Sequence, residues 1–251
     1  MPTYTMRVFR GDARVGAFKE YRVPTDEGMV VLDVIHRIQA TQAHDLACRW
    51  NCKAGKCGSC SAEVNGKPRL MCMTRMDTFV EGEPITVAPI RTFPLIKDLV
   101  TDVSYNYEKA KTIPPLQLKP PDADGRYRMM QEDIDRIQEF HKCIECFLCQ
   151  DVCHVIRDHD LKRQFAGPRF FIKVAGLEMH PLDTADRTDF TQGPAGIGLC
   201  NITKCCTEVC PEQIHITDNG IIPMKERLAD KVDPILWLLQ RFRGQRRPAT
   251  S

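Results

Sequence analysis

Apolar and polar residues alternate in two short segments near the start of the chain. The segments are residues 5–10 (TMRVFR) and 18–23 (FKEYRV), and a stretch from Gly11 to Gly16 separates them. Alternation with a period of two is typical of a strand with one buried face, and glycines suit a turn. The pattern therefore predicts a hairpin of two strands.

The following segment has a helical period instead. Within residues 30–39 (VVLDVIHRIQ), four apolar residues lie at helical spacing: Val31, Val34, Ile35 and Ile38. Further on, SAEVNGKPRL contains Asn65-Gly66, the strongest short hairpin signal. Two strands, a crossing helix and a second hairpin favour a β-grasp fold up to about residue 90.

From about residue 93 the pattern predicts helices. Pro94 suits a first helical position. Leu95, Leu99 and Val103 then recur at four-residue steps along one side. We therefore expect a helix to begin near residue 94.

A proline-rich segment interrupts this helical part. Residues 112–125 (TIPPLQLKPPDADG) contain four prolines and predict a loop. Residues 131–140 (QEDIDRIQEF) resume a helical pattern, with acidic residues in the first turn. The chain is thus predicted to be α+β, with a mixed domain over residues 1–104 and an all-helical domain over residues 105–251.

Composition excludes some classes of function. The 251 residues carry 35 basic and 33 acidic side chains, for a net charge of +2. Such a balance argues against a surface that binds nucleic acid over the whole chain. The hydrophobic content of 43% is enough for each domain to bury a core.

Neither a membrane span nor an export signal is visible in the sequence. The best apolar stretch, residues 235–239 (ILWLL), is far shorter than the roughly 18 residues of a span. Arg7 interrupts the N-terminal segment MPTYTMRVFR, so it lacks the apolar core of a signal peptide. We expect a chain without a transmembrane segment, kept in the cytosol or on the cytosolic face of a membrane.

Thirteen cysteines are the unusual feature of the composition. An odd number of cysteines, in a long chain without an export signal, favours metal binding over disulfides.

The first cysteine group has the spacing C-x4-C-x2-C with a distant fourth cysteine. Its members are Cys52, Cys57, Cys60 and Cys72. This is the spacing of plant-type [2Fe–2S] sites, whereas zinc prefers two close pairs of ligands. Small residues in CKAGKCGSC allow backbone N–H groups to approach the sulfurs of a negatively charged cluster. Cys48 is spare and is predicted to be a buried thiol.

Two further runs share the frame C-x2-C-x2-C-x3-C. CIECFLCQDVC is a complete run, and CNITKCCTEVCP has Thr203 where the second cysteine is expected. In two-cluster ferredoxins the fourth cysteine of each run binds the other cluster. That rule predicts a [4Fe–4S] site and a site with only three thiolates. The first has Cys143, Cys146, Cys149 and Cys210, and the second has Cys153, Cys200 and Cys206.

Thr203 identifies the third site as a [3Fe–4S] site. A threonine hydroxyl is a poor ligand for iron in place of a thiolate, so the fourth iron has no ligand. Cys205 is a possible substitute, but adjacent side chains usually point apart, which favours a non-ligand role.

Three clusters in one chain form an electron relay, because tunnelling falls off exponentially with distance. The sequence contains no G-x-G-x-x-G fingerprint after a strand and no catalytic motif. The relay hypothesis therefore places both donor and acceptor on other subunits, with no catalytic residue in this chain.

The combined motifs resemble the iron–sulfur subunit of succinate dehydrogenase and fumarate reductase. The resemblance rests on the three cysteine groups and on LACRWNCKAGKCGSC and PLIKDLVTDVSYNYEKAK, and it covers nearly the whole chain. It implies a β-grasp [2Fe–2S] ferredoxin domain followed by an α-helical ferredoxin domain with two clusters. The implied partners are a flavoprotein with covalent FAD that binds succinate or fumarate, and a membrane anchor that binds quinone. The implied location is the cytoplasmic face of the inner membrane of a bacterium.

The sequence departs from this family at the quinone end. Members commonly have Pro after the cysteine matched by Cys153, then Trp, and often His after the cysteine matched by Cys200. Here the candidates near the quinone are His154, Arg157 and Asn201. His154 is either a proton shuttle or hydrogen-bond donor beside the cluster or an ordinary packing residue.

Alternative functions remain open. Succinate oxidation and fumarate reduction use the same relay, so the motifs suit both directions. A thiol-linked fumarate reductase is a further candidate, although its members often carry additional cysteine-rich domains, which are not evident here. An iron–sulfur sensor or a zinc scaffold would not need three clusters or Thr203 in that frame.

Overall fold

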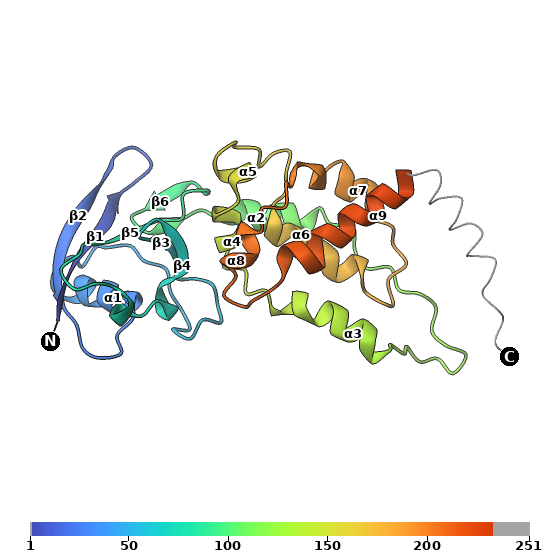
Figure 1. Cartoon of the computed structure of the whole chain (residues 1–251), viewed down its shortest axis with the longest axis horizontal. Coiled ribbons are helices and arrows are strands. Elements are labelled where there is room, and N and C mark those ends of the chain that lie inside the picture. Colours follow the sequence, from blue (N-terminus) through green and yellow to red (C-terminus); the bar gives the residue numbers. More distant parts are fainter. Residues whose placement is uncertain (1, 233–251) are drawn as a thin grey trace.

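The computed structural model describes residues 2–232, which form an elongated molecule with a β-sheet at one end and short helices at the other (Figure 1). Five strands make the main sheet, in the order β2-β1-β5-β3-β4. Strands β1 (Thr3–Gly11) and β5 (Ile85–Ala88) run parallel, and the other neighbours run antiparallel.

Both predicted hairpins are confirmed. Strand β1 pairs with β2 (Gly16–Pro24), and β3 (Ser61–Val64) pairs with β4 (Lys67–Leu70). Asn65 and Gly66 turn the second hairpin with φ of 48° and 73°, as two-residue hairpin loops require.

The predicted first helix is also confirmed as α1 (Val31–Thr41). Its apolar stripe, Val31, Val34, Ile35 and Ile38, is fully buried in one core with sheet residues such as Met6 and Val87. A helix that crosses a mixed sheet in this way is the β-grasp arrangement.

The helix predicted from Pro94 is wrong. Residues 95–101 form a small antiparallel pair, β6 (Leu95–Lys97) and β7 (Val100–Thr101), and α2 (Ser104–Lys111) begins only afterwards. Asp98 turns this pair with φ of 51°, and its buried carboxylate accepts hydrogen bonds from the Gly11 and Ala47 N–H groups at 2.8 Å. These tertiary bonds outweigh the local helical spacing.

From Ser104 to Val232 the named elements are helices, as predicted. Residues 112–125 contain no helix, and α3 (Gln131–Gln138) continues as the 3-10 helix η3 (Glu139–Lys142). The other helices are α4 (Leu148–Asp151), α5 (His154–Arg157), α6 (Pro168–Glu178), α7 (Thr188–Gln192), η4 (Ile197–Leu199), α8 (Cys205–Glu208), the π-helical η5 (Ile216–Ile221) and α9 (Ile222–Val232).

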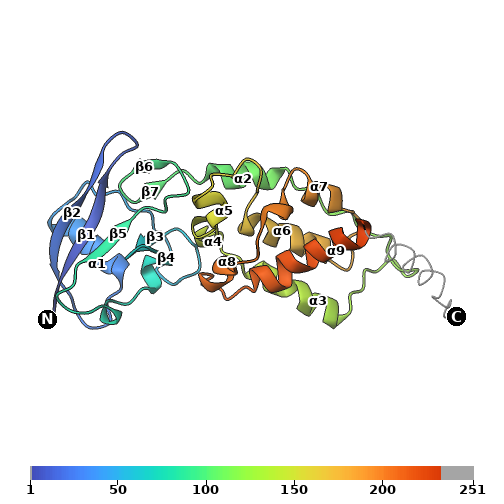
Figure 2. The same ribbon diagram turned by 45° about the horizontal axis from the view of Figure 1, so that its top comes forward.

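These helices enclose a second core centred on α6, where Phe170, Phe171 and Val174 are fully or almost fully buried. Helices α4, α5 and α8 adjoin the sheet domain, and α3, α7 and α9 lie farther away (Figure 2). The first core also takes Cys146, Phe147 and Leu148 from the helical part, so the two domains are packed together. The boundary at residues 104 and 105 stays a prediction.

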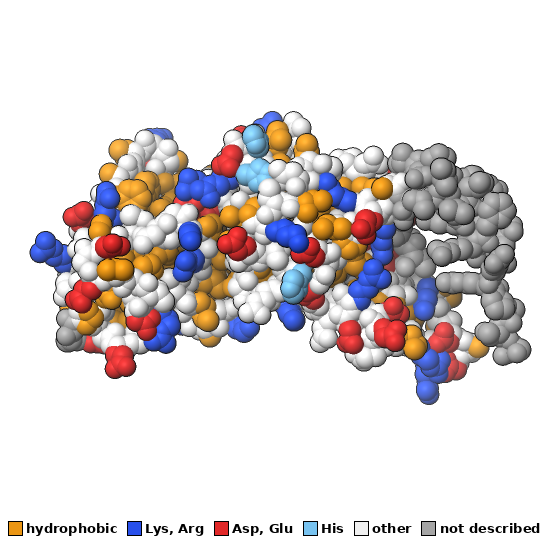
Figure 3. Space-filling view, viewed as in Figure 1, with side chains coloured by type: hydrophobic (Ala, Val, Ile, Leu, Met, Phe, Trp, Pro, Cys, Tyr) orange, Lys and Arg blue, Asp and Glu red, His pale blue; other side chains and the backbone are white. Residues whose placement is uncertain are grey.

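Charged side chains of both signs lie side by side over the face drawn in Figure 3. None of the helices in residues 2–232 has the length and apolar character that a bilayer crossing requires. The apolar stretch 235–239 lies outside the described residues.

Candidate functional site

The first cysteine group lies on the loop before β3 and on the 3-10 helix η1 (Met71–Met73). Backbone N–H groups of Ala54 and Lys56 donate to the Cys52 sulfur at 3.4 and 3.3 Å. The Cys72 N–H donates to the Cys60 sulfur at 3.4 Å. Backbone N–H groups aimed at sulfur are the environment that a negatively charged cluster requires.

The four cysteines of this group differ in their exposure to solvent. Cys52 is exposed and Cys57 is half-buried, whereas Cys60 and Cys72 belong to the first core. Burial acts to raise the pKa of the Cys57 thiol, but hydrogen bonds from Ser59 and from the Cys52 backbone lower it to about 6. Burial raises the pKa of Cys60 to about 12.

A second group of cysteines surrounds an apolar cavity in the helical domain. Ile144, Phe147, Ile172, Ile214 and Ile216 contribute to its lining. Its cysteines are Cys143, Cys146, Cys149 and Cys210. Complete burial and these neighbouring thiols raise the pKa of Cys149 well above its usual value. The structure thus brings the first three cysteines of one run to the last cysteine of the other.

The third group contains Cys153, Cys200 and Cys206. Burial raises the pKa of Cys206 to about 11, and the Cys205 and Cys200 thiols add to the shift. Burial likewise raises the pKa of Cys153 to about 12, with further contributions from Cys205 and Cys206. Cys153 and Cys206 belong to the second core, and Cys200 packs against that same core.

A buried hydroxyl accompanies this third group. The Thr217 Oγ1 lies 3.4 Å from the Cys206 sulfur, and Thr207 donates its hydroxyl to Thr217 at 3.2 Å. The Thr217 N–H in turn donates to Thr207 at 3.1 Å. Because a thiolate has no proton to give, the Thr217 hydroxyl is the donor to sulfur when Cys206 is ionised.

Thr203 and the two cysteines without an assigned cluster, Cys205 and Cys48, lie in different surroundings. Thr203 is exposed, and its hydroxyl lies 3.4 Å from the sulfur of Cys205, the first residue of α8. The non-ligand role of Cys205 stays a prediction. Cys48 is partly buried against the first core, and desolvation raises its pKa to about 12.

Two of the three candidates near the quinone end contact each other. The Asn201 side chain lies 2.7 Å from Nε2 of His154. The Arg157 guanidinium lies 3.6 Å from Glu63 of β3 and 3.9 Å from Asp158. The role of all three at a quinone site stays a prediction.

A buried pair of acids lies where the two domains meet. Asp151 is fully buried and accepts hydrogen bonds from the Thr92 N–H and hydroxyl at 3.2 and 3.0 Å. Burial, reinforced by Glu63, raises the pKa of Asp151 to about 6. Arg91 neutralises Glu63 through two hydrogen bonds of 2.8 and 2.7 Å.

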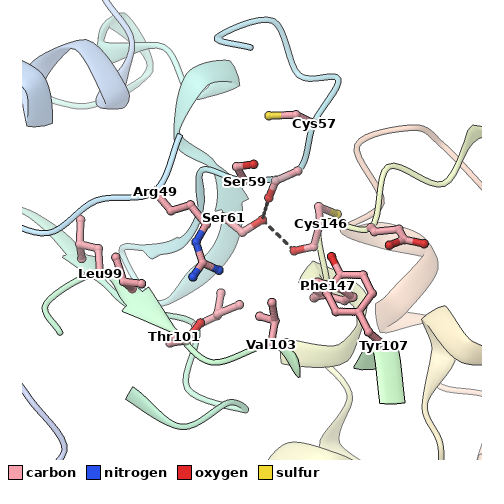
Figure 4. Close-up of a pocket in the computed structure, with 14 residues that line it drawn as sticks. Arg49, Cys57, Ser59, Ser61, Leu99, Thr101, Val103, Tyr107, Cys146 and Phe147 are labelled. Carbon is pink, nitrogen blue, oxygen red and sulfur yellow. Dashed lines mark hydrogen bonds between the residues drawn. The ribbon is translucent and has the colours of Figure 1, made fainter. Parts of the chain in front are cut away.

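A polar pocket lies between the first and second cysteine groups (Figure 4). Cys57 and Cys146 both line it, and the Arg49 guanidinium points into it. The Ser61 hydroxyl lies 2.9 Å from the Gly58 carbonyl oxygen and 2.8 Å from that of Cys146. The two cysteine loops are therefore in direct contact across the domain junction.

These donor sets fit iron–sulfur clusters. Each group supplies only thiols, N–H donors approach the first, and four thiols of the second line one cavity. Within residues 2–232, no group of three or more His, Cys, Asp or Glu side chains is arranged around a single metal ion.

Sequence reasoning missed Ser61, Glu63, Asp151 and Thr217. None of them belongs to a motif, and each acquires its place from segments far away in the chain. The only available sign was that Asp151 lies inside a cysteine run, where a carboxylate is an uncommon neighbour for thiolates.

Comparisons with known proteins agree with this arrangement. Residues 5–108 match the family of 2Fe-2S iron-sulfur cluster binding domains, and residues 139–214 match the 4Fe-4S dicluster domain family. A chain of the Mycobacterium smegmatis Sdh1 complex in the apo form is 63% identical, with a TM-score of 0.90 over 93% of this chain and 99% of that one.

Curated relatives include two fumarate reductase subunits. The fumarate reductase iron-sulfur subunit of Mycobacterium tuberculosis is 33% identical over 78% of this chain and 80% of its own length. The fumarate reductase (CoM/CoB) of Methanothermobacter marburgensis has a subunit that is 32% identical over 81% of this chain, which spans 39% of that longer protein.

Proposed function

The chain belongs to the family of iron–sulfur electron-transfer subunits of succinate dehydrogenase and fumarate reductase, and we propose that it carries electrons from succinate to quinone. In this proposal the dicarboxylate binds to a flavoprotein partner with FAD. Succinate loses two electrons and two protons to become fumarate, and quinone takes up two electrons and two protons to become quinol.

The cysteine groups are proposed to hold three clusters in series. The [2Fe–2S] cluster is assigned to Cys52, Cys57, Cys60 and Cys72. The [4Fe–4S] cluster is assigned to Cys143, Cys146, Cys149 and Cys210, and the [3Fe–4S] cluster to Cys153, Cys200 and Cys206. When bound, such clusters accept and release single electrons, and the chain's residues fix their order and surroundings.

One observation carries the proposal. Cys210 of the second run lines the same cavity as Cys143, Cys146 and Cys149 of the first, and Cys146 contacts the loop of the first group. The cysteines therefore form a continuous series from the sheet domain into the helical domain. A series of this kind suits a relay better than a sensor or a zinc scaffold.

His154 and Asn201 are proposed to face the quinone. Each directly follows an assigned ligand of the three-iron site, and their hydrogen bond joins the two runs. The quinone and its membrane anchor would then lie at this end of the relay. We propose that the chain binds this anchor at the cytoplasmic face of the inner membrane of a bacterium, without a span of its own.

Fumarate reduction is the second candidate function. It is favoured by the M. tuberculosis relative, which is a fumarate reductase subunit. The higher identity to a chain of the Sdh1 complex favours succinate oxidation. The same residues would carry electrons in the reverse direction.

Low-temperature EPR of the purified, air-oxidised complex tests the proposal. A narrow, nearly isotropic signal is expected from an oxidised three-iron site and should disappear when succinate is added. A complex without a flavin-containing partner, or a signal that succinate leaves unchanged, would contradict the proposed function. Comparing succinate–quinone with quinol–fumarate turnover in the same membranes separates the two directions.

A further inference from the structure

The loops that bear Cys57 and Cys146 touch through the backbone of Gly58. Gly58 is buried and has a φ of +66°. A Cβ atom at this position would lie 2.7 Å from the Cys146 Cα and the Ile144 carbonyl oxygen, and 2.8 Å from the Cys146 nitrogen. Because all three atoms belong to backbone, no side chain larger than hydrogen fits without moving the loops apart.

Ser61 joins the same two loops by hydrogen bonding. Its Oγ lies between the carbonyl oxygens of Gly58 and Cys146, at 2.9 and 2.8 Å. Figure 4 shows both contacts as dashed lines across the junction. A serine hydroxyl has one proton, so it donates to one carbonyl at a time and keeps the other within reach.

The contact lies directly between two assigned ligands. Gly58 follows Cys57 in the chain and packs against the backbone of Cys146 itself. An electron that leaves the first group therefore needs only the covalent bonds from Cys57 to Gly58 and one van der Waals contact to reach Cys146. Tunnelling through bonds and close contacts is faster than tunnelling across a gap.

We propose that Gly58 and Ser61 are positioning residues for electron transfer between the first and second cysteine groups. Gly58 permits the close approach, and Ser61 holds it. The proposal rests on the proposed function, in which a reduced [2Fe–2S] cluster donates one electron to an oxidised [4Fe–4S] cluster without a proton. The two residues bind no iron and act through the distance between Cys57 and Cys146.

Other glycines show that backbone conformation alone does not explain Gly58. Gly66 has a similar φ of +73°, but no atom lies within 4 Å of a Cβ built there. At Gly55, in the same cysteine loop, the three atoms nearest to such a Cβ all belong to the flexible side chain of Met73. Gly58→Ala and Gly66→Ala therefore share the strain of a left-handed backbone, and only Gly58→Ala pushes against the second loop.

The test compares these two variants in the intact complex. Iron and sulfide content is measured first, to establish that the clusters are assembled. The magnetic interaction between the reduced [2Fe–2S] and [4Fe–4S] clusters is then measured by EPR relaxation. Rapid freezing after mixing with succinate finally gives the rate at which electrons leave the [2Fe–2S] site.

Gly58→Ala should contain as much iron as Gly66→Ala. It should nevertheless weaken the magnetic interaction and slow electron transfer from the [2Fe–2S] site several-fold. Identical relaxation and transfer in the two variants would overturn the proposal. The result is separable from the proposed function, because wild type and Gly66→Ala must both reduce the [2Fe–2S] site with succinate. If succinate failed to reduce the [2Fe–2S] site in these two proteins, the proposed function would be wrong, and the role of the contact between Gly58 and Cys146 would not be affected.

Ser61 provides an independent variant if Gly58→Ala fails to assemble. Ser61→Ala removes the hydroxyl without adding an atom at the junction, whereas Ser61→Thr retains the hydroxyl on a residue suited to strand β3. Slower transfer in Ser61→Ala, restored in Ser61→Thr, supports the proposal. Equal transfer in wild type and Ser61→Ala, with full iron content, overturns the role of Ser61.

Discussion

The Asn201 amide and the His154 ring are 2.7 Å apart, between Nδ2 of the amide and Nε2 of the ring. Since an amide nitrogen only donates, Nε2 accepts this hydrogen bond, and a neutral ring carries its proton on Nδ1. The bond connects the residue after Cys153 with the residue after Cys200, and so fixes the orientation of His154 beside the third cysteine group.

Removing this hydrogen bond should slow the reduction of quinone and leave the transfer of electrons from succinate into the complex unchanged. We expect Asn201→Ala to lower succinate–quinone activity roughly three- to tenfold, the factor that one hydrogen bond of about 1 kcal/mol implies. Reduction of a dye by succinate should not change. His159→Ala is the matched control, because His159 is an exposed neighbour of the His154 ring. Equal quinone activity in all three proteins would exclude a role for the pair.

Replacing Thr203 by cysteine should convert the proposed three-iron site into a four-iron site. The new thiol completes the C-x2-C-x2-C-x3-C frame and supplies the missing ligand. The air-oxidised protein should then lose its EPR signal and gain one iron atom per chain. Thr203→Val, which offers no ligand, should keep the signal. If Cys205→Ser also changes the iron content of the wild-type site, Cys205 is a ligand and the non-ligand prediction is wrong.

Thr217 should raise the reduction potential of the proposed three-iron site. A hydrogen bond to the Cys206 sulfur stabilises the reduced state, which carries more negative charge. Thr217→Val retains the shape and removes the donor, so the midpoint potential should fall by about 20–60 mV. A redox titration followed by EPR measures this potential. Thr191→Val, which changes a buried threonine of α7 in the same way, is the control. A potential within experimental error of wild type would show that Thr217 does not donate to sulfur.

Glu139 should make the stability of the helical domain depend on pH. Burial acts to raise the pKa of Glu139, but hydrogen bonds from His215 and Asn219 outweigh it and lower the pKa below the ordinary value of 4.5. A lowered pKa means that the stabilisation is present above the unfolded pKa and is lost as the pH falls through the folded pKa.

Glu139→Gln should therefore cost roughly 1–2 kcal/mol of unfolding free energy at neutral pH. The difference from wild type should shrink as the pH falls below about 4.5. Thermal unfolding of both proteins over this pH range is the measurement. A stability difference that stays constant with pH would contradict stabilisation by the ionised Glu139 carboxylate. Glu132→Gln, in the exposed first turn of α3, is the control.

Arg187 should hold the proline-rich segment to the helical domain. Its fully buried guanidinium donates to the carbonyl oxygens of Pro114 and Pro115 at 2.9 and 2.8 Å, and to Asp183 at 2.7 Å. Arg187→Met leaves the buried Asp183 carboxylate without this partner, which typically costs about 3–5 kcal/mol.

Limited proteolysis should then cut the segment 112–130 faster than in wild type. Arg126→Met is the control, because Arg126 lies in the same segment with a side chain that is 77% exposed. Equal cutting rates in the two variants would show that the segment is held by other contacts.

The sequence by itself determined the local elements and the chemistry of the cysteines. Period-two alternation and Asn65-Gly66 predicted both hairpins, and the helical spacing predicted α1, because these signals depend on neighbouring residues. The spacing of the cysteines likewise predicted [2Fe–2S] and [4Fe–4S] binding, which agrees with the matched families, because ligand type and number can be read from the residues. The [3Fe–4S] site inferred from Thr203 stays a prediction.

Only the tertiary structure decided which distant groups meet. Asp98 is bonded to Gly11 and Ala47, and these bonds replaced the helix predicted from Pro94 with a pair of strands. The contact of Gly58 with Cys146 and the bond between Thr217 and Cys206 follow from packing between segments that carry no shared signal. Burial and close approach depend on the whole fold, so no local pattern predicts them.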